Sequence, residues 1–388
     1  MSFTRPGLQT ELDRFFKAIA SSPDCFDTIS KSAFTQSRKK LKPEAFIELM
    51  KGQLNYFNEH APFKKYWKSK RIVAIDGSIL NLPCSEEIKK EFGFVTNSFQ
   101  ENISAMCSFA YDVENELVLN AIIDPVKTSE KDLVVEHLAH LNPDTDILVF
   151  DRGYPALWLM GLLAREGFKF CFRLNSAWKD AVQLAQSNKV DIDWVYQSDV
   201  PQVRPKLKKY SLSSKVTGLR LVCIELANGQ KEILATNLTD REVYSIEDLK
   251  ILYHKRWGIE ESYKTFKKVL HIEHFTGKTA LSVRQDFHAR VFMLNMASMI
   301  ASQGLAEKNS EREEHRKHKS KPNKTQTLAK TKDFLFDIFY RKKELKGILH
   351  QLIHLIARSF EIIRPGRSFK RSNLSLRKRH TAMTSKGI

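Results

Sequence analysis

RIVAIDGSILNLP (residues 71–83) begins a series of strand-like and helix-like segments that decides the fold of this chain. Apolar, β-branched runs predict strands, and longer runs with apolar residues three and four apart predict helices. The expected order is strand, strand, strand, helix, strand, helix, strand, over residues 71–76, 101–113, 116–125, 129–141, 146–150, 155–167 and 168–174. Ser129, followed by acidic residues, is the expected N-cap of the first helix. The series predicts a mixed α/β sheet covered by helices.

Two aspartates stand where apolar strand-like runs give way to turns. Asp76 lies in AIDGSILNLP and Asp151 in VFDRGYPA. Open α/β sheets place ligands at the ends of strands, where the loops form a crevice. An aspartate next to glycine is by itself more typical of a turn than of a ligand. The two aspartates are therefore convincing candidates for ligands only in combination with other acidic residues.

A third candidate acid lies in YHKRWGIEESYKTFK (residues 253–267), which we predict to be part of one helix beginning at Ser245. Tyr253, Arg256, Glu260 and Lys267 have spacings that place them within roughly 60° of each other around a helix. An apolar stripe lies beside them and allows the helix to bury one face. One edge of the helix thus carries a carboxylate, two cations and a phenol.

The spacing Tyr-x2-Arg-x3-Glu-x6-Lys resembles the signature of the IS4 family of bacterial insertion-sequence transposases. The segments around Asp76 and Asp151 are similar to the two aspartate segments of that family. The resemblance covers residues 71–300 and implies a DDE transposase with a ribonuclease-H-like core. Asp76, Asp151 and Glu260 are then the catalytic carboxylates and metal ligands.

The implied chemistry is phosphodiester cleavage and transfer assisted by two metal ions. Mg²⁺ prefers oxygen ligands, so two or three carboxylates are enough, and Mn²⁺ is expected to substitute for it. Two ions per active site activate the attacking hydroxyl and stabilise the leaving oxygen. An Arg fork and a Lys charge suit phosphate groups. The resemblance therefore implies that Tyr253, Arg256 and Lys267 contact DNA, and Lys264 lies on the same helix edge.

The resemblance also implies a domain organisation and partners. It indicates a helical domain over 1–70 that binds DNA ends, with Arg38, Lys39 and Lys40 as contacts, although such charges are equally typical of a solvated helix face. The catalytic core is expected over 71–175 and 246–304, interrupted by a β-rich insertion over 176–245. A helical basic C-terminal region over 305–388 is a candidate for dimerisation. The partners implied are double-stranded DNA, as terminal inverted repeats and target, and a second copy in a synaptic complex.

Composition agrees with a polyanionic partner. The 388 residues carry a net charge of +18, and Lys and Arg bind phosphates by releasing condensed counterions. No apolar run reaches the roughly 20 residues needed to span a bilayer, and the first residues lack a signal-peptide pattern. We expect a cytoplasmic, nucleoid-associated bacterial protein without membrane contact. The five cysteines are scattered, which argues against a zinc site or a disulfide framework.

Two alternatives to a cut-and-paste transposase remain open. One is a metal-dependent nuclease of the same fold that cuts without strand transfer. The other is a catalytically silent DNA-binding protein derived from a transposase. One feature also departs from the family: some relatives carry a base-stacking Trp on the insertion strand where this chain has Glu232, and Trp194 lies elsewhere in the insertion. The resemblance therefore leaves a DNA-hairpin intermediate open.

Overall fold

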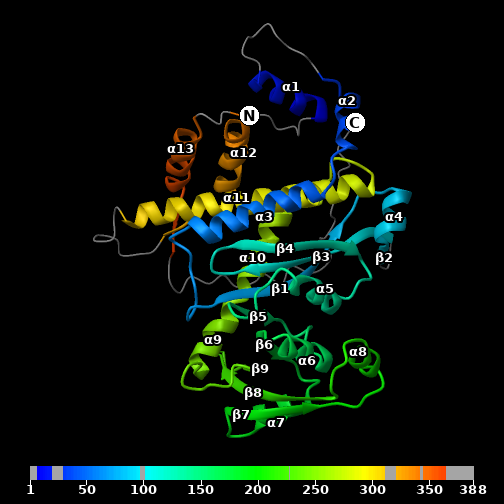
Figure 1. The fold of residues 1–388 in the computed structure, drawn as a ribbon, viewed down its shortest axis with the longest axis vertical. Coiled ribbons are helices and arrows are strands. Elements are labelled where there is room, and N and C mark those ends of the chain that lie inside the picture. Colours follow the sequence, from blue (N-terminus) through cyan, green and yellow to red (C-terminus); the bar gives the residue numbers. More distant parts are fainter. Residues whose placement is uncertain are drawn as a thin grey trace. The chain divides into compact units, whose positions relative to one another are not determined.

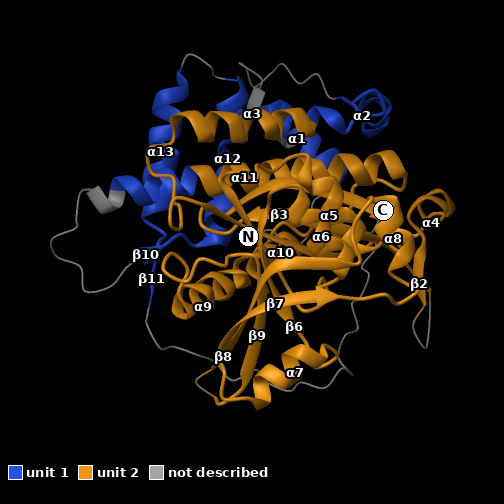
Figure 2. Cartoon of the chain, turned by 60° about the horizontal axis from the view of Figure 1, so that its bottom comes forward, with its two compact units in different colours: residues 1–45, 300–388 blue, residues 46–299 orange. Residues whose placement is uncertain are grey.

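The computed structural model describes residues 7–19, 29–96, 101–226, 228–310, 320–340 and 344–363. The chain divides into two compact units, residues 1–45 with 300–388 and residues 46–299 (Figure 2). The sequence-based domain boundaries lie elsewhere, at residues 70, 175, 245 and 304. Because those boundaries describe functional domains, they stay predictions. The basic segment after residue 363 lies outside the described residues.

A nine-stranded sheet organises the larger unit (Figure 1). The strand order is β2-β3-β1-β5-β6-β9-β8-β7, and β4 pairs with β3. The strands β1, β5 and β6 are parallel neighbours, whereas β3, β4 and β7 to β9 pair antiparallel. The strand bounds are β1 Arg71–Asn81, β2 Phe94–Thr96, β3 Glu101–Asp112, β4 Leu117–Pro125, β5 Asp146–Phe150, β6 Lys169–Leu174, β7 Asp191–Gln197, β8 Lys215–Glu225 and β9 Lys231–Thr236. The predicted mixed α/β sheet is confirmed.

Helices cover both faces of this sheet. On one face, Leu252 and Tyr253 of α9 pack against Ile72, Val149 and Cys171 in a separate apolar cluster. On the other face, buried residues of α5 and α6 join the main core. The helices of this unit are α3 Glu44–His60, α4 Glu86–Phe92, α5 Glu130–Leu138, α6 Leu157–Arg165, α7 Lys179–Gln186, α8 Arg204–Lys209, α9 Ile246–Lys255 and α10 Trp257–Lys268; α11 Ala280–Ser310 runs on into the other unit. Coverage on both faces explains why every residue of β5 is buried.

The second unit is helical in its described parts. It contains α1 (Leu8–Ile19), α2 (Lys31–Arg38), α12 (Lys324–Tyr340) and α13 (Leu345–Ala357), with a short pair of strands, β10 (Ser320–Lys321) and β11 (Glu361–Ile362). Phe15 and Phe336 bring α1 and α12 together, with ring centroids 5.9 Å apart. The Lys330 ammonium donates to the Leu355 carbonyl over 2.7 Å and joins α12 to α13. Both α12 and α13 lie within the C-terminal region that the resemblance predicted to be helical.

Several local expectations need correction. Asp76 lies inside β1 and not at its end, because β1 continues to Asn81 beside β3. Ser129 occupies the N-cap of α5 but its side chain makes no capping hydrogen bond. The predicted helix start at Ser245 is confirmed, and Ser245 forms a capping box with Asp248 in which both reciprocal bonds are present. Lys39 and Lys40 lie beyond the end of α2, so Arg38 alone of that basic group belongs to the helix.

The predicted single helix through Glu260 is divided at Arg256 into α9 and α10. Around this residue the backbone hydrogen bonds tighten to three-residue spacing, from Arg256 N to Tyr253 O and from Ile259 N to Arg256 O. Gly258 follows immediately, and a Cβ there would lie 3.4 Å from the Cβ of Val113. The glycine therefore lets α10 approach the turn between β3 and β4 closely. This accounts for a glycine that helix propensity alone disfavours.

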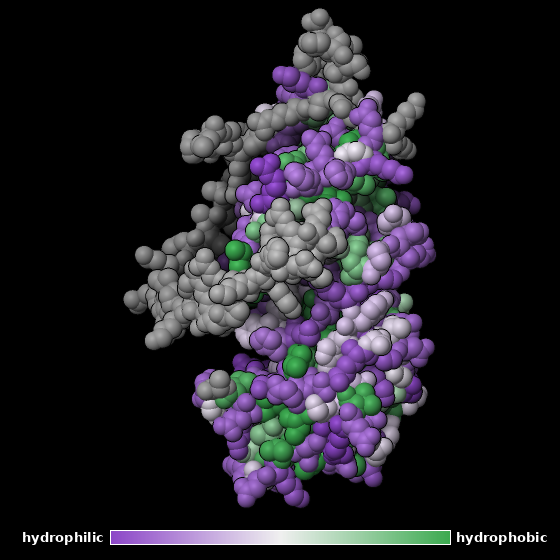
Figure 3. All heavy atoms as spheres, turned by 90° about the vertical axis from the view of Figure 1, so that its left-hand side faces the viewer, coloured by the Kyte–Doolittle hydropathy of each residue, from purple (hydrophilic) through white to green (hydrophobic). Residues whose placement is uncertain are grey.

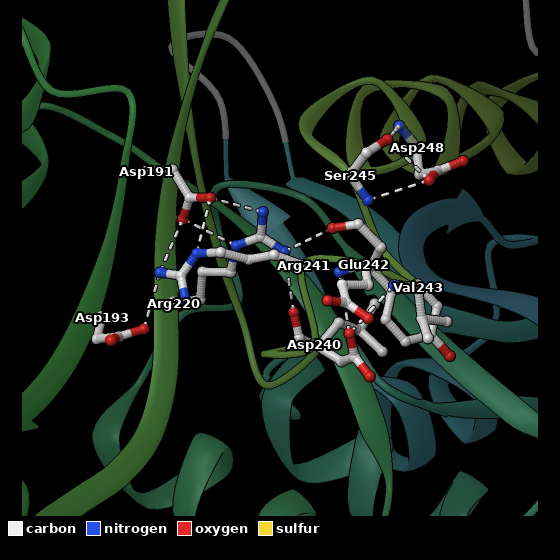
Figure 4. Close-up of polar contacts among 11 residues, drawn as sticks. Asp191, Asp193, Arg220, Asp240, Arg241, Glu242, Val243, Ser245 and Asp248 are labelled. Atoms are coloured by element: carbon white, nitrogen blue, oxygen red, sulfur yellow. Dashed lines mark hydrogen bonds and ion pairs between the residues drawn. The ribbon is translucent and has the colours of Figure 1, made fainter.

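The segment between β6 and α9 adds β7, β8 and β9 to the central sheet and also contains α7 and α8. A cluster of charged side chains holds the end of this segment, where the chain returns to the core (Figure 4). The Arg220 guanidinium, 1% exposed, binds both carboxylate oxygens of Asp191 at 2.8 and 2.7 Å. Arg220 also donates to the Tyr244 carbonyl over 2.7 Å, and Arg241 joins Asp191 from the same loop. The cluster thereby holds the loop that leads into α9.

The surface is dominated by polar side chains. On the face shown in Figure 3, hydrophilic residues form most of the described surface and apolar residues occur in small groups between them. Among the described helices, none combines the length and apolar character that a bilayer crossing requires.

Candidate active site

The register of the parallel strands brings the two aspartates level with each other. In β1 and β5, Ala74 pairs with Val149, so the same register places Asp76 beside Asp151, the residue that follows β5. Neighbours in register project to the same face of a sheet. The two carboxylates, 75 positions apart in the sequence, therefore meet on the face that α9 and α10 cover.

Burial and charge together perturb Asp76. Burial is the main cause that raises its pKa to about 7, and the negative charge of Asp151 adds to the increase. The Gly77 N–H, which donates to Asp76 Oδ1 over 3.0 Å, and the Arg256 guanidinium act in the opposite direction. Asp151 accepts a 2.7 Å hydrogen bond from the Gly153 N–H. These contacts do not fully offset the electrostatic repulsion between Asp76 and Asp151. A cation bound between the two carboxylates would relieve it.

The helix α10 is fastened along β1. The Tyr263 hydroxyl donates to the backbone carbonyl of Asp76 over 2.8 Å, and the Lys267 ammonium donates to that of Ile79 over 2.6 Å. The Tyr263 ring also stacks on Phe109, with centroids 4.7 Å apart. These contacts fix the position of Glu260 relative to Asp76. Lys267, which the resemblance predicts to contact DNA, donates to the protein backbone in this structure.

Glu260 is held by Arg256. The Arg256 Nη2 lies 2.7 Å from Glu260 Oε1, and the arginine is only 7% exposed. Its Nε is buried and has no hydrogen-bond partner among the described residues. The guanidinium also lies 5.7 Å from the Tyr253 ring centroid and 5.8 Å from that of Trp257. Arg256 therefore lies between Glu260 and Asp76, whose negative charge it partly compensates.

The three predicted metal ligands are only partly assembled. Among the residues that the structure describes, no three His, Cys, Asp or Glu side chains are grouped closely enough to hold a metal ion. Asp76 and Asp151 lie together, and Glu260 is bound to Arg256 instead. The donors that do meet are carboxylate oxygens, which suit a hard divalent cation. The Asp76 and Asp151 carboxylates repel each other, and a bound cation would relieve this repulsion. This is the observation that supports a metal ion at the pair.

The remaining predicted residues have different surroundings. Tyr253 is 4% exposed, and burial raises its pKa to about 12. Lys264 forms an ion pair with Glu261 on the exposed side of α10. Arg38, Lys39 and Lys40 belong to the other unit, where both lysines are exposed. Trp194 is buried on β7, at the edge of the sheet, and donates its indole N–H to Asp180 over 2.7 Å.

The structure adds an arginine that sequence reasoning missed. Phe150 of β5 pairs with Phe172 of β6, so Arg173 stands level with Asp151. It forms a 2.8 Å ion pair with Glu232 of β9, the residue at the position where the resemblance indicates a Trp in some relatives. The available signal was the second of the two cations in the otherwise apolar run FKFCFRL, read in register with Asp151.

Two further side chains, Glu130 and Tyr154, surround the aspartates. Glu130 begins α5, and its charge raises the pKa of Asp76 further. Tyr154, 1% exposed, follows the turn after Asp151. Sequence reasoning treated Glu130 only as an acid in the first helical turn.

A family model described as the transposase DDE domain matches residues 67–296, which includes all three carboxylates and the helix α10. The chain belongs to this family. The DDE domain thus coincides with most of the sheet and the helices that frame Asp76, Asp151 and Glu260. Divalent metal ions are generally used in the DDE transposase family.

A curated relative supports the IS4 resemblance within the DDE family. The chain is 23% identical over 250 residues to the transposase InsG for insertion sequence element IS4 of Escherichia coli (strain K12). That match covers 62% of this chain and 54% of the relative, so it spans about half the relative's length. The predicted membership of the IS4 family is confirmed.

A solved structure is also similar. It is the cryo-EM structure of a piggyBac transposase synaptic complex with hairpin DNA, with 12% identity and a TM-score of 0.42. The similarity covers 77% of this chain and 59% of the piggyBac chain.

Proposed function

We propose that this protein is a cut-and-paste DNA transposase that cleaves the ends of its element and joins the 3′-hydroxyls to target DNA. The observation that carries the proposal is that the register of the parallel strands β1 and β5 places Asp76 level with Asp151, beneath a helix that carries Glu260. Family membership supplies the reaction class. The strand order β4-β3-β1-β5-β6, with β1, β5 and β6 parallel, supports a ribonuclease-H-like core.

Asp76, Asp151 and Glu260 would hold Mg²⁺, or Mn²⁺ in its place, as two ions per active site. When bound, such ions activate the attacking hydroxyl and stabilise the charge on the leaving oxygen. The protein's own part is to keep the aspartates level and to hold α10 against β1. Glu260 has to exchange its Arg256 partner before it can join them. A DNA phosphate that binds Arg256 would permit this exchange.

Double-stranded DNA is the substrate that fits the charge of the chain. The free Nε of Arg256 offers a buried phosphate one more donor, and Lys267 lies on the same side of α10 near β1. We propose that Tyr253 supports Arg256 through its ring, which the guanidinium covers. Lys264 is assigned an outer contact, since it pairs with Glu261 on the surface.

The regions outside the sheet receive assignments by family analogy. We propose that residues 1–70 bind the terminal inverted repeats, with Arg38, Lys39 and Lys40 as contacts. Residues 71–175 and 246–304 would form the catalytic core, and 176–245 the insertion. Residues 305–388, with α12 and α13, would contribute to dimerisation in the synaptic complex. Deleting α13 should then prevent pairing of two DNA ends on native gels; an unchanged complex would contradict the last assignment.

An excision assay tests the reaction. The purified chain, Mg²⁺ and DNA with the ends that flank its own gene are incubated together, and cut and joined products are resolved separately. Asp76→Ala, Asp151→Ala and Glu260→Ala should bind ends without cutting them. Glu261→Ala, which removes a neighbouring exposed carboxylate, is the matched control and should retain cutting. Cutting without joining would indicate a nuclease, and binding without cutting by wild type would indicate a silent DNA-binding protein.

A further inference from the structure

A buried chain of polar side chains connects α5 and β4 with the strand that carries Asp76. His137 of α5 is buried between Asn120 of β4 and Ser108 of β3. Its Nε2 lies 2.9 Å from Ser108 Oγ, and its Nδ1 lies 3.0 Å from the side-chain nitrogen of Asn120. The Ser108 hydroxyl donates to the backbone carbonyl of Asp76 over 3.2 Å. The chain therefore ends at a peptide group of the candidate active site.

The direction of each hydrogen bond in this chain follows from its partners. The amide nitrogen of Asn120 can only donate, so His137 Nδ1 accepts, and the neutral ring carries its proton on Nε2. This N–H donates to Ser108 Oγ, whose own proton goes to the Asp76 carbonyl. Burial lowers the pKa of His137 to about 3, which keeps the imidazole neutral. Each donor, from Asn120 onward, thus points toward Asp76.

The peptide between Asp76 and Gly77 can transmit this order to the Asp76 carboxylate. A peptide group is planar, so the direction of its C=O also fixes that of its N–H. The C=O accepts from Ser108 and from Tyr263, and the Gly77 N–H donates to Asp76 Oδ1 over 3.0 Å. Ser108 and its neighbour Phe109, on which Tyr263 stacks, face opposite sides of the sheet. The peptide is therefore held from both faces.

We propose that His137 is a positioning residue for Asp76, which acts through Ser108 to hold the Asp76–Gly77 peptide in the orientation that directs the Gly77 N–H at the carboxylate. The proposal rests on the catalytic role of Asp76 in the proposed function. It gives α5 a part in the reaction, because small displacements of a catalytic group lower the rate strongly. The competing explanation is that His137 only satisfies polar groups in the core. That role predicts lower stability and an unchanged Asp76–Gly77 peptide.

The sequence allows this one peptide to be observed directly. Asp76 and Gly77 form the only Asp-Gly pair in the 388 residues. Full-length protein labelled with ¹³C at the Asp carbonyl and ¹⁵N at Gly therefore gives a single NMR signal from a directly bonded pair of labels. The chemical shift of this signal and the hydrogen-exchange rate of its N–H are then compared between wild type and variants.

Removing either the serine hydroxyl or the imidazole should release the peptide. Ser108→Ala and His137→Met should move the signal and accelerate exchange about five-fold, as loss of one neutral hydrogen bond predicts. His137→Gln should keep the wild-type signal, since a glutamine amide can donate to Ser108 and accept from Asn120. Ser104→Ala is the matched control. Ser104 is also buried on β3, but its hydroxyl donates to the Asn102 carbonyl, so its loss should leave the signal in place.

Cleavage and the ring proton of His137 complete the test. Single-turnover cleavage should fall about five-fold in Ser108→Ala and His137→Met, and less than two-fold in His137→Gln and Ser104→Ala. Ring ¹⁵N spectra of wild type should show His137 protonated on Nε2, and this measurement does not depend on whether His137→Met folds. A proton on Nδ1, an unmoved signal in folded Ser108→Ala, or a moved signal with wild-type cleavage would each overturn the proposal.

The same samples separate this proposal from the proposed function. If Asp76→Ala still cuts DNA, the catalytic role of Asp76 fails, and the positioning role fails with it. If Asp76→Ala abolishes cutting while Ser108→Ala leaves the Asp76–Gly77 signal and the cleavage rate unchanged, only the assignment of His137 fails.

Discussion

The Tyr263 hydroxyl donates to the backbone carbonyl of Asp76, so the helix that carries Glu260 is bonded to the very residue that its glutamate would assist. Ser108 donates to the same carbonyl over 3.2 Å. Tyr263→Phe should cost about 1 kcal/mol of unfolding free energy, and the double variant with Ser108→Ala more than either alone. Urea unfolding measures both. Exposed Tyr66→Phe is the control, and equal losses at both tyrosines would remove the special role of this bond.

The pH dependence of stability should reveal the buried charge of Asp76. Because its folded pKa of about 7 lies above the ordinary value, the folded state favours the protonated form. Stability attributable to this group is present below about pH 4 and is lost as pH rises through 7. In EDTA, Asp76→Asn should therefore stabilise the protein at pH 8 by up to about 4 kcal/mol, and should have little effect at pH 4. Thermal melts across pH, with exposed Asp144→Asn as control, test the sign.

Arg256 should tolerate even a conservative change poorly. Lysine keeps the charge but not the planar fork that holds Glu260 and offers a free Nε. We expect Arg256→Lys to lower the cleavage rate at least ten-fold, or about 1.4 kcal/mol of transition-state stabilisation. Lys264→Ala should alter the rate less than about two-fold, since its ion pair is exposed. Single-turnover cleavage compares the two, and the reverse ranking would refute the roles assigned to them.

Arg173 and Glu232 should affect DNA binding in opposite directions. Arg173 stands level with Asp151 and is partly neutralised by Glu232. Arg173→Gln should weaken binding of DNA ends and reduce the salt dependence by about one phosphate contact. Glu232→Gln frees the guanidinium and should strengthen binding. DNA affinities measured from low to high salt test both variants. If the two variants change the affinity in the same direction, the ion pair has only a structural role.

Arg220 should matter for stability more than any exposed arginine. Removing it leaves partly buried Asp191 with Arg241 as its remaining ionic partner and the Tyr244 carbonyl without this donor, so Arg220→Met should cost about 1–3 kcal/mol. Arg204, whose side chain is 62% exposed and lies 3.4 Å from Asp199, is the matched control, and Arg204→Met should cost less than about 0.5 kcal/mol. Chemical denaturation provides the comparison. Similar losses for both would show that the cluster in Figure 4 does not anchor the loop before α9.

The sequence predicted five strands and two helices from residue 71 to 174 in the right order because apolar runs reflect burial directly, but it missed the short α4 and β2 between β1 and β3. It also indicated the aspartates and Glu260 as candidate site residues, since residue types at a fixed spacing can be recognised in the sequence alone. It did not predict the break at Arg256, which depends on how closely Gly258 packs on Val113. Arg173 and Glu130 were missed for a similar reason. Their proximity to the aspartates comes from strand register and from helix packing, which no local pattern records.

The contact between Tyr263 and Asp76 joins residues 187 positions apart, and it has a consequence for synthesis on the ribosome. The strands β1 to β6 can emerge and pair while the insertion is still being translated. The site, however, closes only after α10 has left the exit tunnel and reached β1. A nascent chain that stops within the insertion would thus present both aspartates without the helix that completes them. Translation of α10 is the step at which this protein acquires its candidate active site.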